Sequence, residues 1–164
     1  MINSNQWLQH VAGRLAANGF SALPPEKYQQ AGFKYAARRS RFELSKFGVA
    51  EYFFTFAEIP NLTPDVLRQF SGASFQFANH NKTASLPNGF FMATFCFAVA
   101  ITANIHPQVA QFIRDSAPIK HWSAFEMPVA FDLMNGGLYY FEKTPVWGAA
   151  YYKGFRREIQ ANLG

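Results

Sequence analysis

The fold is decided by an uncharged stretch at residues 89–105, which reads GFFMATFCFAVAITANI. Its phenylalanine, valine, isoleucine and threonine content is typical of β-strands. The stretch begins at the last residue of Pro87-Asn88-Gly89 and ends before His106-Pro107. Proline, asparagine and glycine in such short segments mark the ends of regular elements. A transmembrane helix needs about 20 apolar residues, and the uncharged stretch 89–105 is barely long enough to form one. Its length therefore argues against a membrane span, as its β-forming composition does. We therefore predict a buried strand and no membrane span.

Both faces of this strand are apolar. A strand that lacks a polar face is expected at the centre of a sheet, with a layer packed on each side. One face carries mostly small side chains, and either a helix layer or a second subunit in a homodimer could cover it. The small face consists of Met92, Thr94, Cys96, Ala98, Ala100 and Thr102, and the other face of Phe91, Ala93, Phe95, Phe97, Val99, Ile101 and Ala103.

Four main helices are predicted around this strand. Apolar residues recur with a helical period in each, and three of the helices begin at a proline, whose missing N–H costs nothing at the first helical position. The three start signals are Thr63-Pro64, His106-Pro107 and Thr144-Pro145. The predicted helices span residues 5–18, 64–79, 107–116 and 145–162, with a short helical turn at 26–30.

Two β-hairpins complete the predicted architecture. The first spans residues 35–59 with a turn at 46–48, and the second joins strands 125–133 and 138–143 through Asn135-Gly136-Gly137. We expect a single α+β domain over residues 1–164, built on a mixed sheet of about five strands, with two hairpins around the long central strand. Helix 5–18 is expected as an appendage to a sheet domain spanning 33–163.

Composition excludes several classes of protein. Of the 164 residues, 49% are hydrophobic and only 15% are charged, which excludes intrinsic disorder. Cys96 is the only cysteine, which excludes a disulfide scaffold. The first ten residues do not resemble a secretion signal, so we expect a cytoplasmic protein. The net charge of +5 makes this a basic protein and permits, without requiring, an acidic partner.

Known catalytic and cofactor motifs are absent from the sequence. It contains no Walker A, GxGxxG, GxSxG, HExxH or CxxC pattern, and no two of its four histidines have the spacing of a local metal site. Cys96 is expected to be an inert core thiol. Asp132, Glu142 and Lys143 resemble a nuclease set, but Glu142 and Lys143 are adjacent and point to opposite faces of a strand. We predict a surface contact between Asp132 and Lys143, and no metal or cofactor.

Basic residues and two histidines are the candidate binding residues. Basic side chains beside aromatic ones suit contact with nucleic acid or another anion, although a solvated surface has the same pattern. His80 lies in the polar stretch 79–83, and His121 lies between Lys120 and Trp122, a composition that suits the rim of a ligand site. The basic candidates are Arg38, Arg39, Arg41, Lys153, Arg156 and Arg157.

These observations favour a soluble binding or interaction domain that associates with itself as a homodimer and that is not an enzyme of known motif. Two alternatives remain open. The first is a nucleic-acid- or anion-binding protein that uses the basic residues. The second is an enzyme with a site assembled from dispersed residues, which would require a pocket that gathers at least two of His80, His106, His121, Asp132 and Glu142.

Overall fold

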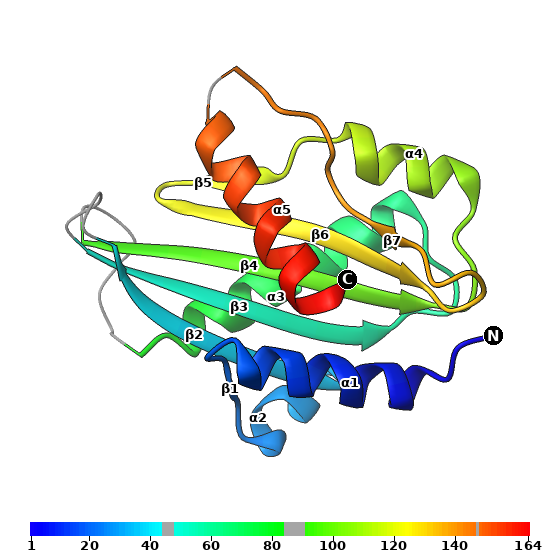
Figure 1. Cartoon of the computed structure of the whole chain (residues 1–164), viewed down its shortest axis with the longest axis horizontal. Coiled ribbons are helices and arrows are strands. Elements are labelled where there is room, and N and C mark those ends of the chain that lie inside the picture. Colours follow the sequence, from blue (N-terminus) through cyan, green and yellow to red (C-terminus); the bar gives the residue numbers. More distant parts are fainter. Residues whose placement is uncertain (44–47, 84–90, 147) are drawn as a thin grey trace.

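A computed structural model describes residues 1–43, 48–83, 91–146 and 148–164 (Figure 1). In these ranges, one mixed sheet has the strand order β1-β2-β3-β4-β6-β5, and β7 also pairs with β6. The strands are β1 (Ser21–Ala22), β2 (Tyr35–Glu43), β3 (Gly48–Glu58), β4 (Met92–Thr102), β5 (Ile119–His121), β6 (Ala124–Asp132) and β7 (Leu138–Tyr139). The helices are α1 (Ser4–Ala17), α2 (Pro25–Gln30), α3 (Pro64–His80), α4 (Pro107–Asp115) and α5 (Ala149–Leu163).

The central strand is β4, as predicted. It pairs in parallel with β3 on one side and with β6 on the other, so that Phe95 lies between Tyr52 and Phe125. The predicted α+β class and mixed sheet are confirmed. Strands β1, β5 and β7 have only two or three residues, too few to show a period of two in the sequence, and the sheet therefore exceeds the predicted five strands. No helix in the described ranges is long and apolar enough to cross a membrane.

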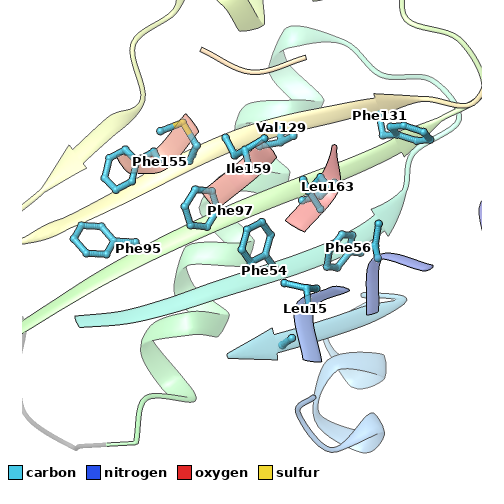
Figure 2. Packing of buried hydrophobic residues seen from close by; sticks show 14 of the residues in the cluster. Leu15, Phe54, Phe56, Phe95, Phe97, Val129, Phe131, Phe155, Ile159 and Leu163 are labelled. Carbon is cyan, nitrogen blue, oxygen red and sulfur yellow. The ribbon is translucent and has the colours of Figure 1, made fainter. Parts of the chain in front are cut away.

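Helices α1 and α5 cover one face of the sheet, where they meet a layer of phenylalanines (Figures 1 and 2). Phe97 is fully buried there, and its ring stacks on Phe54 with 4.5 Å between the ring centroids. In α1, Val11 and Leu15 are fully buried, and Trp7 stacks on Phe131 at 3.9 Å. Helix α1 therefore packs on the sheet itself.

The small-residue face of β4 is covered by helices of the same chain. Cys96 packs in a cluster with residues of α3, and Ala100 packs in a second cluster with residues of α3 and α4. Cys96, Ala98 and Ala100 are at most 1% exposed. Of the two coverings considered for this face, the helix layer is confirmed, because small side chains on the strand let the chain's own helices approach closely.

Two of the three predicted helix starts are confirmed. Thr63 caps α3, since its hydroxyl accepts a hydrogen bond from the N–H of Val66, and His106 precedes α4. The third is wrong: α5 begins at Ala149, after Gly148, whose φ of +87° lies in the left-handed region. The second hairpin also differs, because its outer strand pairs only over Leu138–Tyr139. Lys46 and Phe47, in the predicted turn of the first hairpin, lie outside the described residues.

Candidate functional site

A pocket of about 890 Å³ lies at the amino ends of the three parallel strands β3, β4 and β6. This volume falls in the range of about 300–1,000 Å³ that is typical of sites for small molecules. Its lining comes from the starts of β3 and β4, from the β5–β6 hairpin and from the start of α5. The lining residues are Gly48, Val49, Phe91 just before β4, Met92, Ala93, Phe95, residues 120–123, Phe125, Gly148 just before α5, Tyr151 and Tyr152. We call this cavity the aromatic pocket.

Large aromatic side chains on the wall of the aromatic pocket are exposed to solvent. Phe91 is 68% exposed, Trp122 is 75% exposed and Tyr151 is 41% exposed. The deeper ring of Phe125 lies 5.9 Å from that of Tyr151 and stacks with it. Exposed apolar surface of this kind marks sites where a ligand or partner binds, because a folded chain otherwise buries such rings.

The tip of the β5–β6 hairpin forms one side of the aromatic pocket. His121 and Ala124 are the last paired residues, so Trp122 and Ser123 make the turn. Ser123 has a φ of +52°, a left-handed conformation that is unfavourable for a residue with a side chain. Such strain is found at functional sites. The sequence did not predict this hairpin, because Trp-Ser lacks the glycine or asparagine that signals a tight turn.

His121 is held in a polar cluster next to the aromatic pocket. Its Nε2 lies 2.6 Å from Oε1 of Glu126, and the Ser71 hydroxyl donates to Oε2 of the same carboxylate at 3.0 Å. The imidazole also stacks on Phe75, with 4.2 Å between the centroids and 6° between the planes. Sequence reasoning selected His121 as a rim residue but missed Glu126 and Ser71. The available signal for Glu126 was a lone carboxylate within an apolar strand.

The other histidine candidates lie elsewhere. Nδ1 of His80 is 2.7 Å from the carbonyl oxygen of Gln76 at the end of α3, and His106 accepts a hydrogen bond from the N–H of Gln108 at the start of α4. Of the five residues that a dispersed enzyme site would have drawn on, only His121 is among the described residues that line the aromatic pocket.

Several of the basic candidates hold segments of the fold together. Arg39 forms an ion pair with Glu158 of α5 at 2.5 Å, and its guanidinium lies 4.5 Å from the ring centroid of Phe20. Arg38 donates to the carbonyl of Asn81 at 2.7 Å. Arg156 donates to the carbonyl of Lys143 at 3.2 Å and to the hydroxyl of Thr144. Arg41, Lys153 and Arg157 are exposed, and anion binding by these side chains stays a prediction.

The residues that resembled a nuclease set do not converge. Asp132 is fully buried and accepts hydrogen bonds from the N–H groups of Ile105 and Met134, at 3.1 and 2.8 Å. Lys143 pairs instead with Asp115, at 3.0 Å. The predicted surface contact between Asp132 and Lys143 is therefore wrong, because this carboxylate satisfies backbone donors in the interior. In the ranges that the structure describes, no three His, Cys, Asp or Glu side chains could together hold a metal ion.

Cys96 is expected not to react with a maleimide in the native protein. The thiol is buried, and burial, with a smaller contribution from the negative charge of Glu126, raises its pKa well above the ordinary value. Because the thiolate is the reactive form, labelling should require unfolding. Mass spectrometry after brief exposure should show unmodified protein in buffer and complete single labelling in concentrated urea. Rapid labelling in buffer would show that Cys96 is accessible in the folded state.

Comparison of this chain with models of protein families, with curated proteins and with solved structures finds no match.

Proposed function

We propose that this protein binds a small, flat aromatic molecule in the aromatic pocket. The observation that carries the proposal is the coincidence of a cavity of about 890 Å³ with the exposed rings of Phe91, Trp122 and Tyr151 on its wall. A flat ligand would stack on these rings and remove their apolar surface from water. The cavity is large enough for two or three fused rings.

The charge near the aromatic pocket favours a ligand with an anionic substituent. Lys120 lines the cavity, and no described residue forms an ion pair with it. The chain as a whole carries a net charge of +5, which attracts anions at longer range. Since Lys120 is exposed, its contribution should be modest, so aromatic stacking supplies most of the affinity.

The direct test is a titration with anilinonaphthalene sulfonate, a fluorescent probe that is both aromatic and anionic. We expect saturable binding at one site in the wild-type protein. Ala93 lines the aromatic pocket at the start of β4, and the Ala93→Trp substitution should fill part of the cavity. Its dissociation constant for the probe should rise by roughly tenfold or more, equivalent to about 1.4 kcal/mol. The Lys120→Gln variant should weaken binding by only about two- to fivefold.

The matched control is the Met134→Ala substitution. Met134 is a large exposed side chain (56%) in the β6–β7 turn and does not line the aromatic pocket. This variant should bind the probe as the wild-type protein does. If Ala93→Trp and Met134→Ala both leave the titration unchanged, the probe binds elsewhere and the proposal fails.

A second copy of the chain is the other candidate occupant of this surface, in keeping with the self-association expected from the sequence. The exposed rings of Phe91, Trp122 and Tyr151 favour it, because a subunit interface would cover them. Light scattering on a size-exclusion column should then show a dimer for the wild-type protein and a shift toward monomer for Trp122→Ala. A strict monomer at high protein concentration would exclude this candidate.

A further inference from the structure

The exposed aromatic side chains of this chain gather at one end of the sheet. Three of them lie on the wall of the aromatic pocket, at the amino ends of the parallel strands, which lie together at the left of Figure 1. The fourth, Phe42, reaches the same end because β2 runs antiparallel to β3, and it pairs there with Val49 of the pocket wall. Among the residues that the structure describes, the exposed phenylalanine, tyrosine and tryptophan side chains are Phe42 (61%), Phe91 (68%), Trp122 (75%) and Tyr151 (41%). We call these four residues the aromatic end.

Exposed basic residues accompany three of the four rings. Each lies within two positions of a ring in the sequence. All three are exposed, and none of the ion pairs between described residues includes any of them. The three are Arg41 beside Phe42, Lys120 before Trp122 and Lys153 after Tyr151.

The carboxylates near the aromatic end do not offset this positive charge at the surface. None of the described residues that line the aromatic pocket is acidic. Glu51 and Glu126, near the starts of β3 and β6, are at most 5% exposed, and Glu43 at the end of β2 accepts a hydrogen bond from the Tyr52 hydroxyl at 2.5 Å. The exposed carboxylate of Glu58, in contrast, lies at the other end of β3. The aromatic end therefore presents apolar rings and positive charge together.

We propose that the aromatic end binds the surface of a membrane that contains anionic phospholipids, with its rings among the headgroups and its basic side chains against the phosphates. Tryptophan and tyrosine favour this region, because their rings are largely apolar and also form hydrogen bonds. Burial of the rings and attraction of the basic side chains to anionic lipid both contribute to the affinity. Such binding requires no membrane-spanning helix and goes beyond the proposed function, since it does not depend on a ligand in the aromatic pocket.

The charge favours a lipid surface over a second copy of the chain at the aromatic end. A symmetric dimer formed through this end would cover the rings, but it would also bring the basic residues of the two copies together, and like charges across an interface are unfavourable. An anionic bilayer covers the same rings and complements the charge. The rings come from four separate places in the sequence, and a fluid lipid surface can adapt to such a dispersed arrangement.

The test is co-sedimentation of the protein with vesicles, in the absence of any aromatic ligand. The partition coefficient should be at least roughly tenfold higher for phosphatidylcholine vesicles with about 30% phosphatidylserine than for pure phosphatidylcholine. About 0.5 M salt should remove most of this difference by screening. The Phe91→Ala/Trp122→Ala double variant should bind roughly tenfold or more weakly to anionic vesicles, because it loses apolar surface.

A second double variant, Arg41→Gln/Lys153→Gln, separates the charge from the rings. It should bind anionic vesicles roughly tenfold more weakly and leave the weak binding to pure phosphatidylcholine unchanged. The matched control is Ile2→Ala/Met134→Ala, which removes two exposed apolar side chains (39% and 56%) near the turn after β6, at the other end of that strand. This control should bind both kinds of vesicle as the wild-type protein does.

Three results would overturn the proposal. They are no sedimentation of the wild-type protein with anionic vesicles, equal losses for the control and the aromatic-end variants, and unchanged binding when Phe91 and Trp122 are replaced. A dimer that dissociates in the Phe91→Ala/Trp122→Ala variant, together with no vesicle binding, would assign the aromatic end to a second copy of the chain. Each of these results leaves the proposed function standing, because that function is tested by the probe titration without lipid.

Discussion

Replacement of Phe97 by alanine is expected to lower the free energy of unfolding by about 3 to 5 kcal/mol, the cost of deleting a fully buried aromatic ring. Phe97 lies at the centre of β4 with no exposed surface (Figure 2). Its ring stacks on Phe54 at 4.5 Å and meets the edge of Phe155 of α5 at 6.0 Å. The substitution would leave a cavity between the sheet and α5, where Phe54 and Phe155 lose their contacts with the deleted ring. Urea denaturation followed by circular dichroism measures the loss.

The control for this substitution is Phe42→Ala on β2. Phe42 is 61% exposed, so its removal should change the free energy of unfolding by about 0.5 kcal/mol or less. If Phe97→Ala lowers the free energy of unfolding by less than about 1 kcal/mol, the result would contradict the close packing described for the face of the sheet that α1 and α5 cover.

The Asp132→Ala variant is expected to lose about 3 kcal/mol, because the substitution leaves one buried and one part-buried backbone donor without an acceptor, at about 1–3 kcal/mol for a buried donor. The carboxylate accepts hydrogen bonds from the N–H groups of Ile105 and Met134, at 3.1 and 2.8 Å, and from the side-chain amide of Asn135 at 3.1 Å. It therefore joins the loop after β4 to the turn after β6. Thermal and urea unfolding should both show the loss.

Two further variants separate this role from a general effect of charge. Asp132→Asn keeps one oxygen acceptor and should be intermediate in stability. Asp115→Ala removes a surface carboxylate that pairs with Lys143, and such solvent-exposed pairs contribute little to stability because water screens them. Equal losses for Asp132→Ala and Asp115→Ala would show that the backbone hydrogen bonds of Asp132 do not stabilise the fold.

The candidate site was only partly predictable from the sequence. The neighbours Lys120, His121 and Trp122 pointed to a ligand rim, and all three line the aromatic pocket. Ser71, in contrast, lies 55 residues from its partner Glu126 along the chain, and no local pattern relates the two. The hydrogen bond between Ser71 and Glu126 depends on how α3 packs on the sheet. The periodicity of a single sequence carries no information on that packing.

The basic residues show the same limit. Along β2, Arg39 and Arg41 lie two residues apart, so side-chain alternation predicts that they share a face of the strand but does not predict the partner of Arg39. The structure places Arg39 against Glu158 and Phe20, where it joins β2 to α5 and to the segment after α1. No local sequence pattern indicates Glu158 as the partner of Arg39, because the two residues lie 119 positions apart along the chain.

Residues 89–105 determined by themselves that the chain contains a strand with two apolar faces, since side-chain alternation and β-branched or aromatic content are local properties. Two such faces require a central position in the sheet, and β4 occupies it. Only the tertiary structure decided that α3 and α4 cover the small face, and that the amino ends of the parallel strands leave an aromatic pocket open. Those outcomes depend on the path of the crossover connections and on the fit of one element against another, which no stretch of sequence encodes alone.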